Sequence, residues 1–555
     1  MKDNAAANLR RRDSFKYVLV IEGVLIGVIT GALISVFRLM LTWADGMREK
    51  MAGMAGSGPV PLIYGAVLIV IIVIIAVLLE LEPDIAGSGI PQVEAELRGQ
   101  KDMAWYKVIP AKMIGCAIAI GGGLALGREG PSIQLGAMVG KGFARSGHRL
   151  LTEERLLITC GAGAGLSAAF GAPLAGAIFS LEELHRNFSA EVLLSTMAAS
   201  AASEFVSANV FGLAPVFGFG VEHGLPLSSY WAVIIVGIIV GLFGIVYNRT
   251  IAWMQDRFDG IGKKFAAAFG KITRKQVFNL TDRHLNTTGM RAARTGKLIA
   301  VFAAAYILMF CMPEALGSGS YLVGQISRGY YALPALALLL AVKFVFSTAS
   351  FGSGSPGGIF LPLLVLGAVT GGLVCRVLGL FGFNQTYITA LVVAAMAGYF
   401  SAIVRAPVTG VILITEMTGD FSCLLPLVLS SLIAYIIAEY AGSEPIYTQL
   451  LRRSQRGTVI ARRRGALLRN RKSVIEAEIH LGSYMDGRNV QDFGLPLGTL
   501  IISVVRDGVE IIPDGHTILR AGDELEILLR EDDINDVESL IDSRCKEVKE
   551  NKEKE

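Results

Sequence analysis

The segment Gly127-Arg128-Glu129-Gly130-Pro131 breaks an otherwise apolar stretch of the chain with two glycines, a proline and a pair of opposite charges. Proline suits the first turn of a helix, because the N–H that it lacks would have no partner there. Glycine lets the backbone turn just before that helix. The segment therefore predicts an interrupted helix, in which a new helix begins close to Glu129.

The sequence around this segment has the composition of a membrane protein. Hydrophobic residues make up 53% of the 555 positions, only 18% are charged, and the mean hydropathy is +0.54. A transmembrane helix needs about 20 consecutive apolar residues. Runs of this length include Tyr17–Leu41, Leu62–Leu81, Tyr230–Trp253, Thr295–Met312 and Phe421–Ala441. The chain is therefore expected to be an all-α polytopic membrane protein over most of its length.

Basic residues are concentrated in two flanks. Residues 1–16 hold five basic residues against two acidic ones, and residues 452–472 hold nine basic residues and no acidic one. Cytoplasmic segments next to membrane spans are enriched in Lys and Arg. We therefore expect a multi-pass protein of the inner (plasma) membrane with both termini in the cytosol. The first apolar run is too long for a cleavable signal peptide, and nucleic-acid binding by the basic flank is the weaker interpretation.

The membrane region repeats itself. Three elements recur in the same order at offsets of 230, 231 and 234 residues. They are GSG at 87–89 and 317–319, GREGP at 127–131 with GIFLP at 358–362, and the segments 167–182 and 401–416. Two homologous halves, about 17–215 and 229–447, explain this order. Internal repeats are typical of transporters, whose substrate sites lie between the repeats near the middle of the membrane.

The breaks near Gly87, Gly127 and Gly358 each predict a helix N-terminus inside the membrane. Free N–H groups and about half a positive charge at such an end attract an anion, and a site without a full positive charge also releases it. The sequence thus predicts transport of a small anion. Close helix packing is the alternative explanation for glycines, and we assign it to Gly121–Gly123 and Gly161–Gly165.

The residues give little support to a metal site, a disulfide framework or an enzyme active site. The six cysteines are scattered, with no CxxC pair and no histidine at ligand spacing, so neither a metal site nor a disulfide framework is expected. The spans contain no HExxH and no clustered His/Asp set, which argues against a membrane-embedded enzyme. We predict no catalytic residue and no cofactor in the membrane region.

The three break motifs resemble the signature motifs of the CLC family of chloride channels and proton/chloride exchangers. The resemblance covers about residues 15–450, with Ala172–Gly176 and Tyr447 in the expected order. It implies a CLC-type inverted repeat with interrupted helices, a homodimer, and one independent anion pathway in each subunit. The anion-binding residues that the resemblance implies are Ser88, Gly89, Arg128, Glu129, Gly130, Ile359, Phe360, Leu361 and Tyr447.

The resemblance also implies individual roles. The hydroxyls of Ser88 and Tyr447 would donate to a central anion, together with backbone N–H groups of Ile359 and Phe360. Read from the residues alone, Ser88 could be a turn residue and Tyr447 an interfacial tyrosine. Serine at position 88 resembles the chloride-type members, because nitrate-preferring members tend to have proline there. Export of fluoride or another anion is the less favoured alternative.

Two glutamates, Glu129 and Glu183, carry the distinction between exchange and conduction. Glu129, a capping carboxylate in the plainest interpretation, is by resemblance a gate that competes with the anion and carries a proton. Glu183 is by resemblance the internal proton-transfer residue, whereas Glu182 has a repeat partner in Glu416, which argues for a structural role shared by both halves. Glu129 with Glu183 favours proton-coupled chloride antiport, and a gated passive chloride channel is the alternative.

The remainder of the chain predicts a small soluble domain. A basic linker at 451–473 leads to an α+β domain at 474–543, and a charged tail occupies 544–555, while 1–16 form the N-terminal tail and 17–450 the transmembrane domain. The run Val490–Pro496, followed by Ile501–Gly508 and Ala521–Asp523, resembles the C-terminal subdomain of RCK (TrkA-C) modules. The resemblance implies a dimeric, regulatory domain, with cyclic di-AMP as a hypothetical ligand; a dimerisation platform that binds nothing is the alternative.

Overall fold

The structure, a computed structural model, describes residues 2–54, 58–185, 189–218, 224–276, 282–454, 472–496, 498–506, 509–530, 537 and 540–546. The chain divides into two compact units, residues 1–453 and 454–555, which are described separately. Most of the predicted basic linker (455–471) and most of the predicted charged tail (547–555) lie outside the described residues.

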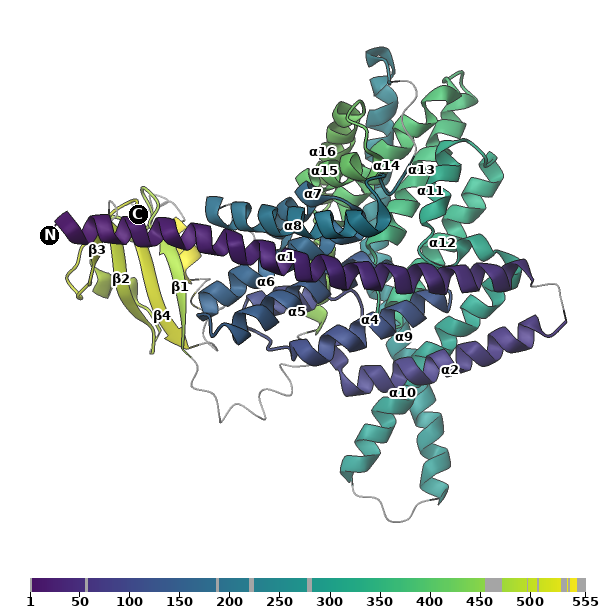
Figure 1. Cartoon of the computed structure of the whole chain (residues 1–555), viewed down its shortest axis with the longest axis horizontal. Helices are drawn as coiled ribbons and strands as arrows, with labels where there is room; N and C mark the ends of the chain where they lie inside the picture. The colour runs from purple at the N-terminus through teal and green to yellow at the C-terminus, as the bar shows by residue number, and fades with distance from the viewer. Residues whose placement is uncertain are drawn as a thin grey trace, which may run out of the picture. The chain divides into compact units, whose positions relative to one another are not determined.

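The first half of the membrane unit is entirely helical in its described part. An apolar hairpin of long helices comes first, then a series of shorter helices separated by glycine-rich breaks (Figure 1). The elements are α1 (Lys2–Gly53), α2 (Val60–Leu81), η1 (Pro83–Ile85), α3 (Ile90–Leu97), α4 (Trp105–Gly121), α5 (Glu129–Ser146), α6 (Leu151–Phe170), α7 (Pro173–Phe179), η2 (Ser180–His185) and α8 (Ala190–Phe211).

The second half repeats this order, as the sequence predicts. The elements are η3 (Leu227–Ser229), α9 (Tyr230–Gln276), α10 (Asp282–Cys311), η4 (Pro313–Ala315), α11 (Ser320–Ser327), α12 (Leu333–Gly352), α13 (Phe360–Gly379), η5 (Gln385–Tyr387), α14 (Ile388–Val404), α15 (Pro407–Thr418) and α16 (Leu424–Tyr440). Residues 446–454 form a last helical segment, which carries Tyr447. Helices α9 and α10 continue past their neighbours as a hairpin (Figure 1).

Packing follows the repeat. Helix α1 packs on α8 as α9 packs on α16, and α5 packs on α6 as α13 packs on α14. The equivalent helices α7 and α15 also contact each other, as do α2 and α10, and α5 and α13. The two halves therefore pack in the same way and contact each other through equivalent helices.

Glycines set the distance between α5 and α6. A Cβ atom added to Gly161 would lie 2.1 Å from the carbonyl oxygen of Gly136, and one added to Gly165 would lie 2.1 Å from that of Ser132. Only glycine permits backbones to approach this closely. The packing role predicted for Gly161–Gly165 is confirmed, and it holds the helix that begins at Glu129 in place.

Seven helices in the described part are long and apolar enough to cross a membrane, judged by length and composition. They are α1, α2, α9, α10, α12, α13 and α14. Four of the five predicted apolar runs fall within this group. The fifth, Phe421–Ala441, forms the 17-residue helix α16, which is shorter than the run because the helix begins only after the turn at Ser422 and Cys423.

The second unit contains a small antiparallel sheet. Its strands are β1 (Lys472–Glu478), β2 (Leu500–Arg506), β3 (Val509–Ile511) and β4 (Glu524–Arg530), arranged in the order β1-β4-β2-β3. Alternate residues such as Ile501, Leu525 and Ile527 are buried in one core. The four strands lie almost entirely within residues 474–543, where the sequence predicts the small α+β domain.

An ion pair fixes the loop before β4. The Arg506 guanidinium donates to both oxygens of the buried Asp523 carboxylate, each at 2.7 Å, and Arg520 N–H donates to the same group at 2.8 Å. Burial by itself raises the pKa of Asp523, but these hydrogen bonds and the charges of Arg506 and Arg520 outweigh it and lower that pKa below its usual value. The carboxylate is therefore ionised at neutral pH.

Candidate functional site

Three helix N-termini meet at the glycine-rich breaks. Helix α3 begins after Gly89, α5 after Arg128 and α13 after Ile359. Gly89 has a φ of 99°, a left-handed conformation that glycine adopts without strain. All three helices start where the sequence predicts, because each break combines glycine with a proline in the first turn of the new helix.

The repeat-related breaks at 127 and 358 are joined directly. Gly127 N–H donates to Gly358 carbonyl oxygen at 2.7 Å, and Gly358 N–H donates to Gly127 oxygen at 2.8 Å. This isolated antiparallel bridge satisfies backbone groups that lipid could not satisfy. It also places the starts of α5 and α13 beside each other, so that their free N–H groups face a common region.

The Glu129 carboxylate lies in that region. Its side chain is fully buried, and its Oε2 accepts a hydrogen bond from the Leu361 backbone N–H at 3.3 Å, in the first turn of α13. A Cβ atom on Gly127 would lie 2.2 Å from the same Oε2, so a larger residue here would displace the Glu129 carboxylate. A negative group thus occupies the N-terminal end of α13, where the helix dipole favours negative charge.

Ser88 approaches the same place from α3. Its side chain is 2% exposed, and its Oγ would lie 2.2 Å from a Cβ atom on Gly130. Glycine at position 130 therefore lets the start of α5 contact Ser88. On the opposite side, a Cβ atom on Gly89 would collide with Gln134 of α5. The break before α3 is held tightly against α5.

Several buried polar atoms near the breaks have no hydrogen-bond partner among the described residues. They include Ser88 Oγ, Glu129 Oε1 and Tyr447 Oη. Burying a polar group without a partner costs about 1–3 kcal/mol, so such atoms indicate a place where a ligand or water binds. Tyr447 is fully buried and lies within electrostatic reach of both Glu129 and Glu183.

Phe360, the first residue of α13, packs into an aromatic cluster. Its ring centroid lies 4.7 Å from that of Phe400, 5.5 Å from Phe170 and 6.5 Å from Phe179. Ile359 is the N-cap residue of α13, and the N–H groups of Phe360 and Leu361 lie in its first turn, where helical N–H groups have no intrahelical partner. Of these groups, the Leu361 N–H donates to the buried carboxylate of Glu129.

Glu182 and Glu183 have different surroundings in η2. The Glu182 carboxylate accepts hydrogen bonds from Thr409 N–H at 2.8 Å and Thr409 Oγ1 at 2.6 Å, at the start of α15. Its repeat partner Glu416 accepts from Leu174 N–H at 3.0 Å and Ala175 N–H at 2.8 Å, at the start of α7. Each half thus caps a helix of the other. Glu183, the next residue, is 5% exposed.

The sequence analysis did not single out two buried lysines, Lys112 and Lys343. Lys112 Nζ donates to the carbonyl oxygens of Ile85 at 2.9 Å and Gly87 at 2.7 Å. Lys343 Nζ donates to those of Ala315 at 3.0 Å and Gly317 at 2.8 Å. Both are fully buried, and each holds the turn before one copy of the GSG motif. Their numbers differ by 231, the offset of the repeat, which is the signal that could have identified them.

A cavity of about 320 Å³ adjoins the starts of α5 and α13. Arg128 and Leu361 line it together with Ser318, the repeat equivalent of Ser88, and with Asp45 and Glu49 of α1. Asp45 forms an ion pair with Arg48 at 2.5 Å. The cavity thus brings charged and polar side chains of the C-terminal part of α1 next to Arg128, the residue before Glu129.

Sequence comparisons identify both parts of the chain. Residues 67–439 match the family described as "Voltage gated chloride channel", and residues 474–542 match the "TrkA-C domain". The chain is 31% identical over 458 residues to the H(+)/Cl(-) exchange transporter ClcA of Vibrio parahaemolyticus, which covers 80% of this chain and 91% of the relative. It is 35% identical over 382 residues to ClcA of Vibrio cholerae, covering 67% and 75%.

Solved structures agree with this assignment. A slow cyanobacterial Cl−/H+ antiporter matches with a TM-score of 0.68 and 28% identity, over 79% of this chain and 97% of that protein. A CLC-type fluoride/proton antiporter shares the fold alone, with a TM-score of 0.59 and 22% identity over 78% and 97%. The chain therefore belongs to the voltage gated chloride channel family, whose members are membrane transport proteins rather than enzymes.

Proposed function

We propose that this protein exchanges chloride for protons across the inner (plasma) membrane, with Glu129 as the gate. The observation that carries the proposal is the buried Glu129 carboxylate at the N-terminal end of α13, hydrogen-bonded to Leu361 N–H. A carboxylate in this position acts as a tethered anion. It occupies the place that a mobile anion of the same charge would occupy.

Protonation releases the gate. A neutral carboxyl group is no longer attracted by the dipoles of α5 and α13, so it gives up its place to chloride. When chloride leaves, the side chain loses its proton and returns. Because one position accepts either the carboxylate or the chloride ion, movement of one substrate is tied to movement of the other in the opposite direction.

The remaining predicted residues complete the path. Ser88 Oγ, Tyr447 Oη and the N–H groups of Ile359 and Phe360 would donate to chloride at a central position, while N–H groups of Arg128, Gly130, Phe360 and Leu361 line the position of the Glu129 carboxylate. Glu183, buried and within electrostatic reach of Tyr447, would pass protons between Glu129 and the cytosol. The partnerless hydroxyls of Ser88 and Tyr447 support this assignment.

Exchange and passive conduction differ in the measured reversal potential. In liposomes with opposed pH and chloride gradients, we expect the reversal potential of the protein to depend on both gradients. Electrogenic flux measured with a voltage-sensitive dye provides this potential, and a matched experiment without the pH gradient is the control. A potential determined by chloride alone would identify a gated channel and contradict the exchange mechanism.

The proposal also covers the orientation of the protein in the membrane and its assembly. The basic flanks at 1–16 and 452–472 support a cytosolic location of both termini. We further propose a homodimer in which each subunit has its own anion pathway, as the resemblance to the CLC family implies.

The second unit would regulate transport. Its match to the TrkA-C domain supports a ligand-binding role, and cyclic di-AMP is the ligand we propose. We expect the dinucleotide to change chloride flux by the full-length protein in liposomes when it is supplied on the cytosolic face. Calorimetry with the full-length protein showing no heat of binding would contradict the regulatory role of this ligand.

A further inference from the structure

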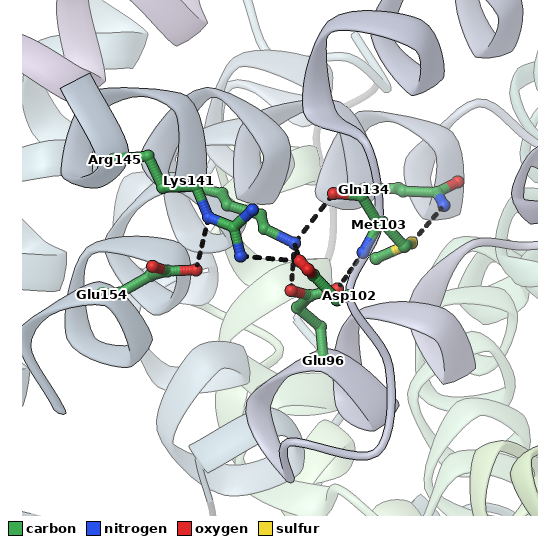
Figure 2. A network of polar contacts seen from close by, with 7 residues as sticks. All are labelled: Glu96, Asp102, Met103, Gln134, Lys141, Arg145 and Glu154. Carbon is green, nitrogen blue, oxygen red and sulfur yellow. Dashed lines mark hydrogen bonds and ion pairs between the residues drawn. The ribbon is translucent and has the colours of Figure 1, made fainter. Parts of the chain in front are cut away.

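A buried network of charged side chains joins the last turn of α3 to α5. It lies outside the anion path proposed above. At its centre is Lys141 of α5, whose side chain is fully buried. Its ammonium group forms an ion pair with Glu96 of α3, donates to Asp102 Oδ1 at 2.7 Å and donates to the Met103 carbonyl oxygen at 2.8 Å (Figure 2). A buried ammonium needs this many acceptors, because an unpaired buried charge is very unfavourable.

The network ties three parts of the chain together. Glu96 also accepts from Met103 N–H at 2.7 Å, so one carboxylate binds both α5 and the loop after α3. Further out, Arg145 donates to Asp102 at 2.6 Å and to Glu154 of α6 at 3.2 Å (Figure 2). The positive charges of Lys141 and Arg145 thus offset the negative charges of Glu96 and Asp102. Glu154 of α6 ends the network.

The network also reaches the turn that precedes α3. Gln134 of α5 donates to the Asp84 carbonyl oxygen at 2.9 Å and approaches Met103 Sδ at 3.6 Å. Asp84 is additionally paired with Lys101. The segment before α3 is therefore bound to α5 through Gln134 and Asp84. The segment after α3 is bound to α5 through Lys141 and Met103.

Helix α3 is only eight residues long. Glu96 lies in its last turn, and Ser88 and Gly89 lie immediately before its first residue, about 12 Å away along the helix axis. A helix of this length behaves as a rigid rod, so fixing its last turn fixes its first. On the other side, Lys112 binds the carbonyl oxygens of Ile85 and Gly87. Ser88 is thus held between two buried lysines.

Stability alone does not explain the ion pair. Replacing a buried salt bridge by apolar residues of similar volume is often neutral or stabilising, whereas the charged version imposes a defined geometry. We propose that Lys141, Glu96 and Asp102 position the start of α3, and with it the Ser88 hydroxyl, and thereby set the preference of the transporter for chloride over larger anions. Lys141 and Glu96 are positioning residues, and the inference rests on the proposed role of Ser88 in binding the central anion.

The test is the double variant Lys141→Met with Glu96→Met, which removes both charges and leaves neither unpaired. Purified protein in liposomes is assayed for chloride efflux and nitrate efflux separately. We expect the ratio of the chloride rate to the nitrate rate to fall about three- to tenfold, the factor that corresponds to weakening one hydrogen bond to the anion. A network that only supports folding would lower both rates together and leave the ratio unchanged, which would overturn the proposal.

Two further variants keep the result interpretable. The matched control is Lys297→Met with Asp259→Met, which removes a Lys–Asp pair between α9 and α10 and should leave the ratio unchanged; a change of the same size there would also overturn the proposal. If the double variant does not fold, Glu96→Gln replaces it, because the neutral amide keeps the side-chain shape; an unchanged ratio in folded Glu96→Gln protein contradicts the positioning role.

Ser88→Ala separates this inference from the function on which it rests. A lower ratio in Ser88→Ala with an unchanged ratio in the network variants would refute only the positioning role. An unchanged ratio in Ser88→Ala would refute the role of Ser88 in the central anion site and the present inference with it, while reversal potentials would still report on exchange.

Discussion

Replacing Glu129 by glutamine abolishes proton transport while chloride continues to cross the membrane. The amide cannot take up and release a proton, and it carries no charge to hold it at the N-terminal end of α13. The hydrogen bond from Leu361 N–H can persist, because the amide oxygen is also an acceptor, so the fold should be unaffected. We expect proton flux at the background of empty liposomes and chloride flux within about tenfold of the wild-type rate, a barrier change of roughly 1.4 kcal/mol.

The measurement records both fluxes at once, with a pH electrode and a chloride electrode in the same liposome suspension. Glu183→Gln is the matched variant on the inner side and should also lose proton transport. Glu182→Gln should keep proton transport, because the Glu182 carboxylate caps α15 and lies off the proposed path. Persistent proton flux in Glu129→Gln would show that the gate has been assigned to the wrong residue.

Replacing Gly161 by valine prevents the membrane unit from folding. Even the Cβ atom at this position would lie 2.1 Å from the Gly136 carbonyl oxygen, and valine adds two methyl groups. Helices α5 and α6 must then separate, and this would also displace Glu129 at the start of α5. Overpacking a tight contact costs about 1–3 kcal/mol and more where backbone must move. We expect a loss of more than about 3 kcal/mol, seen as loss of the monodisperse peak in size-exclusion chromatography in detergent.

The control is Gly260→Ala in α9, where an added Cβ atom meets nothing within 4 Å. Alanine favours a helix over glycine by about 0.8–1 kcal/mol, so this variant should be as stable as the wild type or slightly more stable. A folded, active Gly161→Val protein would mean that α5 and α6 do not pack as closely as described.

Local features of the sequence predicted the helix starts. Glycine and proline act on the backbone of their own segment, so the beginnings of α3, α5 and α13 can be read from residues 87–91, 127–131 and 358–362. The repeat was likewise visible, because both halves keep their breaks at nearly one offset. The length of α16 was predicted less well, since turn residues such as Ser422 are embedded in an apolar run.

The sequence by itself therefore determined an anion-attracting set of helix ends in a duplicated membrane protein, together with the soluble sheet domain. Only the tertiary structure decided which ends meet. The Gly127–Gly358 bridge, the crossed caps of Glu182 and Glu416, and the Lys141–Glu96 pair join residues 45 to 242 positions apart. Such contacts depend on how the two halves pack, and no local pattern of glycine, proline or charge specifies a partner at that distance. The helix starts are local, whereas the site they form is not.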